Sequence, residues 1–405
     1  MAFVLFEDAS HFDLLPLTYT RPLYGLRCGI LNMDQRWEQV FGAPLGRQAY
    51  DYLQPVFGQA VAGEDLTWIN GKFVPEPELI RLVRDLPPGT AWLTPRGELL
   101  AARSGPSLPD TDGLITPERA AEMGLRSETV ALDPPAIRFP EDIFALNREL
   151  IAFDFPLVTG AAPSAGITDP HTRVYGADNI YVAPGAQTRA AILNAEDGPI
   201  YLGPHSLVSE GTIVRNSHAL LAHAVVAPGA KLRGDTTVGP WSKAGGEVTN
   251  TVIMGYSNKG HDGYLGNAVL GYWCNIGADS NSSNLKNNYA NVKLWHYPSG
   301  CFRDTGRQFC GLIMGDHSKC GINTMLNTGT VVGVSANIFG AGFPRVFIPS
   351  FAWGGAHGFS SYRIDKALEV ARLVMSRRGL ALNEQEQAIL TAVYERSAPY
   401  RRWEH

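Results

Sequence analysis

Aliphatic residues recur at every sixth position through the middle of the chain. Seven leucines and valines keep this spacing without a gap, namely Leu202, Val208, Val214, Leu220, Val226, Leu232 and Val238. Ala244 continues the same spacing. A period of six fits neither a 3.6-residue helix nor a long flat strand of period two. It is typical of a coil of short strands joined by tight turns, with one aliphatic side chain per strand pointing inward. We therefore predict the stacked turns of a parallel β-helix.

The six-residue spacing also sets the extent of this predicted β-helix. It returns between Leu270 and Ile276, and again from Met314 to Ile338. We expect the coil to run from about residue 175 to about residue 345, with interruptions near 247–264 and 284–311. About three hexads, or 18 residues, would close one triangular turn and bury a continuous aliphatic column.

The segments on either side of the repeat predict two further parts of the chain. An apolar strand at 3–6 and a hairpin at 68–74 that turns on Asn-Gly suggest an α/β domain. Amphipathic stretches predict helices at 32–41, 76–84, 117–123, 141–153, 364–378 and 383–396. A segment rich in Pro, Ala, Ser and Gly at 163–170 marks the boundary, so we divide the chain into domains at 1–165, 166–355 and 356–405.

Composition and charge exclude several classes of function. The 34 Lys and Arg residues are outnumbered by 39 Asp and Glu, which leaves no basic field for nucleic acid or an anionic membrane. No apolar run approaches the length of a membrane span, and acids at Glu7 and Asp8 interrupt the first apolar segment. Five scattered cysteines suggest neither a disulfide framework nor a zinc site. We expect a cytoplasmic protein.

Polar residues crowd one stretch of the repeat where a regular coil needs none. His261 lies in a loop of this stretch and can act as a general base near neutral pH. The adjoining carboxylate of Asp262 can orient or polarise the imidazole. The alternative is a loop histidine that is held by backbone hydrogen bonds and has no catalytic part.

The order of residues from His261 to Asn284 resembles a known enzyme family. His261 is followed by Tyr264-Leu265-Gly266-Asn267-Ala268, then by Asn275-Ile276-Gly277-Ala278, then by Asn284. This order is similar to the acetyltransferase half of the bifunctional sugar-phosphate nucleotidyltransferase/glucosamine-1-phosphate N-acetyltransferases (GlmU-like enzymes). The chain resembles a divergent bacterial branch of that family even more closely, because it also carries Pro16-Leu17-Thr18-Tyr19-Thr20-Arg21-Pro22 followed by Arg27 and Gly29.

The resemblance implies a fold and roles for several residues. The fold would be a left-handed parallel β-helix of hexapeptide repeats behind a nucleotidyltransferase-like α/β domain, usually a homotrimer with acetyl-CoA between subunits. His261 would be the base that deprotonates the sugar amine. Tyr264 and Asn275 would hold the sugar phosphate, and Asn284 would lie between the sugar and the acetyl group.

The chain also departs from the family pattern. Leu285-Lys286-Asn287 replaces the Tyr-Asp-Gly that follows the family asparagine, and an extra segment follows, so the acceptor sugar can differ. Four lysines are candidate phosphate partners: Lys231, Lys243, Lys259 and Lys286. Solvent exposure is the default reading for each of them. Three histidines on one stretch, His205, His218 and His223, are better explained by solvation or hydrogen bonds than by a shared metal, because their offsets of 13 and 5 are not multiples of six.

The N-terminal segment lacks the glycine-rich loop that nucleotidyltransferases of this kind use to approach phosphates. In this chain, the corresponding residues 6–13 contain no glycine. Arg21 and Arg27 are candidate nucleotide-binding residues, and Asp8 and Asp13 are weak candidates for holding Mg²⁺. Equally, the arginine at 21 can anchor a turn and the aspartate at 8 can end a strand.

Three functions therefore remain open from the sequence. The leading one is an acetyl-CoA-dependent N-acetyltransferase that acts on an aminosugar phosphate and is fused to a nucleotidyltransferase-like domain for sugar-nucleotide synthesis. A second is a sugar-1-phosphate uridylyl- or thymidylyltransferase that uses UTP or dTTP with Mg²⁺ and has a structural β-helix. A third is a non-catalytic scaffold that binds a sugar nucleotide.

Overall fold

The computed structural model describes residues 2–61, 65–104, 113–160 and 162–404. Contacts divide the chain into two compact units: Met1–Leu26 with Leu31–Phe139, and Arg27–Ile30 with Pro140–His405. Composition placed the domain boundary near residue 165, whereas the contacts place it after residue 139. The two criteria therefore divide the chain at different places.

The first unit is the expected α/β domain. Its six-stranded mixed sheet has the order β2-β1-β3-β5-β4-β6. The strands are β1 (Ala2–Phe6), β2 (Gly46–Arg47), β3 (Leu66–Asn70), β4 (Thr90–Leu93), β5 (Leu99–Ser104) and β6 (Arg126–Thr129). The helices are α1 (Ser10–Asp13), α2 (Met33–Phe41), α3 (Gln54–Phe57), α4 (Pro77–Arg84) and α5 (Pro117–Glu122), with 3₁₀ turns η1 (Leu17–Tyr19), η2 (Leu23–Gly25) and η3 (Asp51–Leu53). The expected helices at 32–41, 76–84 and 117–123 are thus confirmed.

The expected hairpin at 68–74 is wrong. Strand β3 ends at Asn70, and it pairs in parallel with β1 and antiparallel with the more distant β5. A turn does follow Asn70, because the Phe73 amide donates to the Asn70 carbonyl oxygen over 3.4 Å, but no strand returns from it along β3. The buried Asn70 side chain donates to the carbonyl oxygen of Leu99 and to Asp8. Phe73 then bridges to Ala136 rather than folding back on β3.

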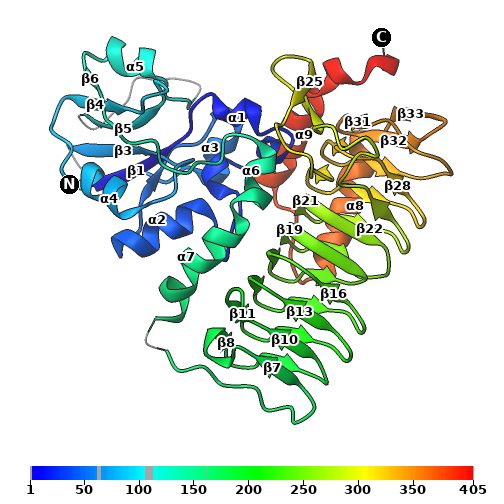
Figure 1. The fold of residues 1–405 in the computed structure, drawn as a ribbon. Helices are drawn as coiled ribbons and strands as arrows, with labels where there is room; N and C mark the ends of the chain where they lie inside the picture. Colours follow the sequence, from blue (N-terminus) through cyan, green and yellow to red (C-terminus); the bar gives the residue numbers. More distant parts are fainter. Residues whose placement is uncertain (1, 62–64, 105–112, 161, 405) are drawn as a thin grey trace. The chain divides into compact units, whose positions relative to one another are not determined.

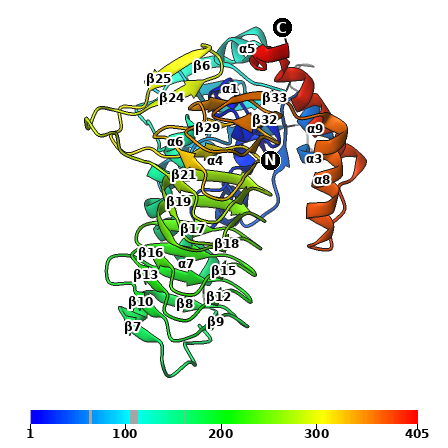
Figure 2. The same cartoon turned by 90° about the vertical axis from the view of Figure 1, so that its right-hand side faces the viewer.

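The second unit contains a parallel β-helix whose strands form three faces (Figures 1 and 2). The first face has β7 (Arg173–Tyr175), β10 (Ile192–Asn194), β13 (Ile213–Arg215), β16 (Lys231–Leu232), β23 (Asn281–Ser282) and β28 (Met325–Leu326). The second has β8 (Ile180–Val182), β11 (Ile200–Leu202), β14 (His218–Leu220), β17 (Thr236–Val238), β26 (Ile313–Met314), β29 (Val331–Val332) and β31 (Phe347–Ile348). Two long strands, β19 (Glu247–Gly255) and β21 (Tyr264–Tyr272), run from the first face into the second.

The third face completes each turn of the coil. It consists of β9 (Gln187–Thr188), β12 (Leu207–Val208), β15 (Val225–Val226), β18 (Lys243–Ala244), β20 (Asn258–Lys259), β22 (Asn275–Ile276), β27 (Lys319–Cys320), β30 (Asn337–Ile338) and β32 (Ala352–Gly355), with β33 (Gly358–Ser361) antiparallel at its edge. Parallel strands in such a stack lie about 4.8 Å apart, so each coil presents its side chains directly over those of the previous one.

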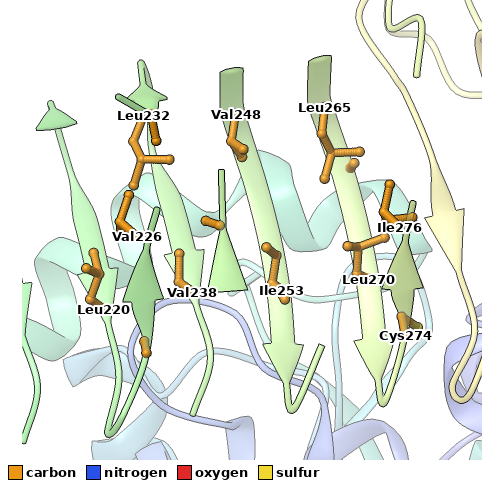
Figure 3. Close-up of a cluster of buried hydrophobic side chains, with 14 of the residues drawn as sticks. Leu220, Val226, Leu232, Val238, Val248, Ile253, Leu265, Leu270, Cys274 and Ile276 are labelled. Carbon is orange, nitrogen blue, oxygen red and sulfur yellow. The ribbon is translucent and has the colours of Figure 1, made fainter. Parts of the chain in front are cut away.

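The six-residue spacing marks the interior of this coil, as predicted. All seven aliphatic residues from Leu202 to Val238 have no exposed surface, and Ala244 is equally buried. Figure 3 shows the labelled side chains from Leu220 to Val238 pointing between the faces, with Leu220, Val226 and Leu232 supplied by three successive strands. Because each face contributes one apolar side chain per turn, the coils share one continuous hydrophobic core.

The two expected interruptions differ in kind. At 284–311 the chain leaves the coil and forms a hairpin of β24 (Lys293–His296) and β25 (Cys301–Asp304). Near 247–264, by contrast, the expectation of an interruption is wrong, because the coil continues with shorter steps. Strand β19 passes from one face to the next without a turn, so its inward residues Val248 and Ile253 are five positions apart instead of six.

One expected helix is divided, and its parts cover the second face of the β-helix. The stretch predicted at 141–153 forms α6 (Pro140–Ala145) and α7 (Asn147–Thr159). Ile30 and Ile151 pack in one buried cluster with Ala219 and Leu221 of the β-helix. The 27–30 segment therefore lies among α7 and the coils, although it is distant from both in sequence.

The C-terminal helices form as expected, as α8 (Ile364–Ser376) and α9 (Glu384–Arg396), followed by the 3₁₀ turns η5 (Ala398–Tyr400) and η6 (Arg402–Glu404). A further 3₁₀ turn, η4 (Ala177–Asn179), lies in the first coil. Just after α8, Arg378 donates to the backbone oxygen of Trp241 and places its guanidinium 5.6 Å from the centre of that ring. Among the described residues, every helix is too short or too polar to cross a bilayer.

The hydrophobic column should be the main source of stability of the β-helix. Replacing the fully buried Leu220 with Ala removes the Cγ and both Cδ methyl groups from a closed core, and we expect the free energy of unfolding to fall by about 2–5 kcal/mol. Urea denaturation followed by circular dichroism measures this change. Leu373→Ala on α8 is the matched control, because that side chain is 60% exposed. Equal losses in the two variants would contradict the assignment of the core.

Candidate functional site

His261 and Asn275 line the same cavity on the third face of the β-helix. Asn275 opens β22 and points outward because its neighbour Ile276 points into the core. His261 follows β20 at the corner that leads to the first face, and its side chain is exposed. The cavity has a volume of about 840 Å³ and is bordered on one side by Val374, Arg377 and Arg378 at the end of α8.

The lining of this cavity is strongly cationic. Four positive side chains reach it, namely Lys243, Lys319, Arg377 and Arg378, and its lining contains no aspartate or glutamate. A concave surface with one sign of charge concentrates ligands of the opposite sign. Sequence reasoning proposed only Lys243 among these four. The two arginines had no sequence signal, because they follow an amphipathic helix and reach the cavity through the tertiary fold.

Tyr264 and Asn284 form a second polar group on the first face, around the corner from the cavity. The Asn284 side-chain amide donates to the Tyr264 hydroxyl over 2.9 Å and to the Asn267 side-chain oxygen over 2.8 Å. Burial raises the pKa of Tyr264, and nearby Glu247 adds to that rise. The phenol is therefore neutral at physiological pH and can donate a hydrogen bond. The fold thus brings the four predicted residues together as two pairs.

The expected partnership of His261 with Asp262 is not present. Both side chains are exposed, and within the described part of the chain no hydrogen bond joins the imidazole to this carboxylate. The loop is fixed through its backbone instead. The Tyr264 amide donates to Asn281 over 2.8 Å, and the peptide oxygens of His261 and Asp262 accept from Lys259.

Lys259 points into the interior of the β-helix, where the other third-face positions are mostly aliphatic. It is aligned with Ala244 on the previous coil and is fully buried. Its ammonium donates to the carbonyl oxygens of His261, of Asp262 at 2.9 Å and of Gly245 at 3.4 Å. Burial lowers the pKa of Lys259. Because its donors are used inside the coil, the expectation that Lys259 is exposed or binds phosphate is not supported.

The other candidate lysines have different surroundings. Lys243 lines the cavity, whereas Lys231 is exposed on the first face. Lys286 donates to the backbone oxygen of Asn291 within the inserted segment. Of the four, Lys243 is therefore the one placed beside His261.

Stacked rings follow one corner of the β-helix. Six residues with positive φ, one from each of successive coils, supply them: His205, His223, Trp241, Tyr256, Trp273 and His317. The ring centres of His205 and His223 are 5.1 Å apart, and those of His223 and Trp241 are 4.0 Å apart. The offsets of 13 and 5 predict that the three histidines mostly face different sides of the coil. For His205 and His223 this is wrong, because their separation of 18 residues is one full coil. That spacing was the available sequence signal.

His218 differs from this stacked pair, because it is fully buried on β14. One ring nitrogen lies 3.1 Å from the Asn216 carbonyl oxygen. Burial lowers the pKa of His218 to about 4. Across the described ranges, no group of three or more His, Cys, Asp or Glu side chains is placed to hold a metal ion.

The aspartates proposed for Mg²⁺ lie at the end of β1 and in α1. Asp8 is mostly buried and accepts from the Lys72 ammonium over 2.6 Å and from Asn70 over 2.8 Å. Lys72 also pairs with Glu98. Burial alone raises the pKa of Glu98, but the hydrogen bonds and positive charges of Arg138 and Lys72 outweigh it, so the pKa falls to about 2. This arrangement fits a structural ion-pair network, and it does not present Asp8 as an open metal ligand. Asp13 ends α1.

The two candidate nucleotide-binding arginines have unlike positions. Arg21 lies between the turns η1 and η2 and is partly buried. Arg27 is buried and donates to the carbonyl oxygens of Met254 and Ile30 within the second unit. Gly29 has a φ of +82°, and a Cβ there would lie 2.8 Å from the Leu150 backbone, so both the conformation and the close approach favour glycine. Arg27 and Gly29 therefore anchor a chain segment to the β-helix, and this arrangement gives no support to nucleotide binding by Arg27.

Comparisons with known proteins agree with this architecture. Residues 3–162 match the family model described as sugar nucleotidyl transferase. The bifunctional protein GlmU of Synechococcus elongatus is 27% identical over 208 residues, which cover 49% of this chain and 41% of the relative. A bifunctional sugar-1-phosphate nucleotidylyltransferase/acetyltransferase of Sulfurisphaera tokodaii is 28% identical over 36% of this chain and 38% of its own length.

The class that these matches define is that of sugar-phosphate transferases with a nucleotidyltransferase-type N-terminal domain and a β-helix. The chain is similar to GlmU-like bifunctional nucleotidyltransferase/acetyltransferases, the same family that its motifs resemble. The matched region spans less than half the length of each of these relatives. Among solved structures, the polySia specific acetyltransferase NeuO covers 51% of this chain and 95% of its own at 15% identity, with a TM-score of 0.29 that supports no conclusion.

The interior position of Lys259 leads to a prediction about the His261 loop. Lys259→Met keeps the length of the side chain in an apolar surrounding but removes the donor to two loop carbonyls. Losing charge-assisted hydrogen bonds should speed amide hydrogen exchange at 260–264 by at least about 10-fold, while the fold persists. Mass spectrometry of exchanged peptides measures this rate. The control is Lys366→Met on α8, an exposed lysine whose ion pair with Glu369 is also exposed. Unchanged exchange in Lys259→Met would contradict the role of Lys259 in holding the loop that carries His261.

The buried His218 leads to a prediction about acid stability. Its pKa is about 4 when folded and ordinarily 6.5, so between these values the unfolded chain binds more protons than the folded one. The contribution of the neutral His218 to the free energy of unfolding is therefore complete above pH 6.5. It is lost as the pH falls toward 4, and at pH 5 the loss is about 2 kcal/mol. Urea denaturation at pH 7 and pH 5 should show a smaller loss in His218→Asn. If His218→Asn lost as much unfolding free energy between pH 7 and pH 5 as the parent protein does, His218 would not be the group that titrates.

Proposed function

We propose that the chain is an acetyl-CoA-dependent N-acetyltransferase that acts on an aminosugar phosphate. One observation carries this proposal: His261 and Asn275 share a cavity with four cations and no carboxylate in its lining. Phosphorylated sugars and coenzyme A are anionic, so the charge of the cavity is complementary to both. The similarity of the chain to bifunctional nucleotidyltransferase/acetyltransferases supports the same class of reaction.

His261 acts as the general base in this proposal. An aminosugar carries an ammonium group at neutral pH, and it attacks a carbonyl carbon only after it loses a proton. The exposed imidazole at the corner of the coil is open to solvent and substrate, and the two carbonyls held by Lys259 fix the backbone on which it stands. The proton moves from the sugar nitrogen to the imidazole. The nitrogen then bonds to the acetyl carbon, the carbon–sulfur bond to coenzyme A breaks, and the thiolate leaves as the thiol after it takes up a proton from the imidazolium or from water.

The cations of the cavity are placed to bind the anionic groups of the reactants. Acetyl-CoA supplies an acetyl group that is activated as a thioester. Lys243, Arg377 and Arg378 fit its phosphates, because guanidinium and ammonium groups bind phosphate oxygens by charge-assisted hydrogen bonds. The Asn275 side chain can hold the sugar phosphate or a hydroxyl group beside them.

Tyr264 and Asn284 serve the acceptor sugar from the first face. Their mutual hydrogen bond fixes both side chains before a ligand arrives, which reduces the entropy lost on binding. The neutral phenol can donate to a sugar phosphate oxygen. The inserted segment that begins after Asn284 adjoins this pair, so it is placed to change which sugar is accepted.

The family match at residues 3–162 favours a second activity in the N-terminal unit, the joining of a sugar 1-phosphate to UTP or dTTP. Such reactions use Mg²⁺, but Asp8 is already engaged by Lys72 and Asn70. The described residues therefore do not fit the expected metal site, and we assign no step to it. Pyrophosphate release from nucleotide and sugar phosphate would establish this activity, and binding without turnover on any donor would favour the scaffold.

We also propose a homotrimer, as is usual in the family. Large apolar side chains remain exposed on the later coils and near the cavity: Ile322, Phe339, Phe343 and Trp353. Ile322 is 71% exposed and also lines the cavity that contains His261. Exposed apolar groups of this size are typical of surfaces covered by another subunit.

Removing the His261 imidazole tests the acetyltransferase proposal. His261→Ala should lower the rate of acetyl transfer at least ~10²-fold, because the ammonium of the acceptor then has no positioned base. Release of free thiol from acetyl-CoA measures the rate across several aminosugar phosphates.

The control is His357→Ala, which removes another exposed histidine outside the cavity and should leave the rate unchanged. Circular dichroism checks that both variants are folded. Full thiol release by the His261 variant would contradict the role of His261 as the base. If the parent protein released no thiol with any acceptor, the proposed acetyltransferase activity would be rejected.

A further inference from the structure

A second cavity, of about 690 Å³, lies at the end of the β-helix where its last coils are stacked. Six aromatic side chains contribute to its lining: Trp295, Phe302, Phe347, Phe359, Tyr400 and Trp403. Figures 1 and 2 show that the hairpin β24–β25, strand β33 and the C-terminal turns meet at this end. None of the residues proposed for acetyl transfer lines this cavity.

The aromatic walls of the cavity are held in place before any ligand binds. Trp295 stacks on Phe347 with ring centres 4.2 Å apart and an interplanar angle of 13°. The indole N–H of Trp403 donates to the Ser361 hydroxyl over 2.8 Å, and its ring stacks near Phe359. Fixed rings offer flat apolar surfaces without a large loss of side-chain entropy on binding.

Two exposed arginines make the cavity electropositive. Arg345 and Arg402 both line it, and no carboxylate contributes to the lining. Within the described ranges, neither guanidinium is paired with an acidic side chain. The nearest acid in sequence, Glu404, is already bonded to the buried Arg401 over 2.8 Å. The cavity therefore combines apolar ring faces with two uncompensated positive charges.

The walls come from segments that the repeat does not require. Trp295 and Phe302 belong to the insertion after Asn284, and Tyr400, Arg402 and Trp403 follow the last helix. The buried aliphatic column itself is supplied by the coils, and Trp403 of the C-terminal turn packs against it as well as lining the cavity. Both extra segments nevertheless converge on one cavity, which indicates that this cavity has a purpose of its own.

We propose that this second cavity binds a nucleoside phosphate. A nucleobase is a flat aromatic ring that stacks on aromatic side chains, and its phosphate is an anion that arginine binds in a bidentate manner. A peptide or a neutral sugar would leave the two guanidinium groups without a counter-charge. An inorganic anion would leave the ring faces unused. A nucleoside phosphate satisfies both features of the lining.

Two sources could supply this chemistry, namely a free or sugar-linked nucleotide and the 3′,5′-ADP portion of coenzyme A. The proposal names their shared base, ribose and phosphate, and the probes separate the two. Binding at this cavity does not require that His261 be catalytic, so this proposal and the acetyltransferase can fail independently.

Hydrogen exchange of the full chain locates the binding. UDP or 3′,5′-ADP should slow exchange in peptides that cover 293–304 and 345–349, while ribose 5-phosphate and inorganic phosphate should bind at least ~10-fold more weakly because they lack the base. The double variant Arg345→Gln with Arg402→Gln should weaken nucleotide binding at least ~10-fold. Isothermal calorimetry measures these affinities.

Two further variants control the result. Arg363→Gln removes another exposed arginine, one that pairs with Asp365, and it should leave binding unchanged. Trp403→Leu removes a stacking face and should weaken binding of the nucleotides more than of phosphate. The proposal is overturned if nucleotides protect neither segment, if phosphate alone binds as well as they do, or if the double arginine variant binds normally. Protection by only one of the two nucleotides would support it and identify the source.

Discussion

Closure of the apolar column governs the structure of the second unit. Each strand of the coil points one side chain inward, and three such strands per turn seal a core that water does not enter. The spacing of six follows from this closure, since an inward residue on one face must be followed by a corner before the next. Where β19 rounds a corner without a turn, the step shortens to five, yet Val248 and Ile253 still point inward. The constraint is therefore inward burial, and the period is its consequence.

Lys259 shows how the coil accommodates a charge at an inward position. An unpaired ammonium in such a core would cost several kcal/mol, so the position requires partners. Those partners are the carbonyl oxygens of the loop that carries His261. The penalty of burial thus favours one conformation of the loop, because any rearrangement that removes the two loop carbonyls leaves the ammonium with only the more distant Gly245 carbonyl, at 3.4 Å. Packing in the core and the geometry of the candidate base are coupled through one side chain.

Sequence reasoning succeeded where the determining interactions are periodic and failed where they are distant. The hexads predicted which residues are buried, because each inward position repeats the same environment. Treating 247–264 as an interruption concealed Lys259, although a frame counted back from Ile276 through Leu270 and Leu265 reaches it once a five-residue step is allowed. The surroundings of Arg27 could not be predicted, since its partner Met254 lies 227 positions away. Likewise, nothing in the pattern around Asp8 announces the ion pair with Lys72.

The corner between the third and first faces divides the candidate site. Asn275 and the cations face the cavity on one side of it, whereas Tyr264 and Asn284 are bonded to each other on the other side, with His261 at the turn between. The chain departs from the family pattern directly after Asn284, and the insertion there rejoins the coil through the Leu285–Phe309 bridge. The departure thus begins on the first face, and no residue of 285–309 contributes to the lining of the third-face cavity. Under the proposed reaction, the insertion adjoins the part of the acceptor site that Tyr264 and Asn284 form, whereas Asn275 and the donor-binding cations lie in a cavity that the insertion does not line.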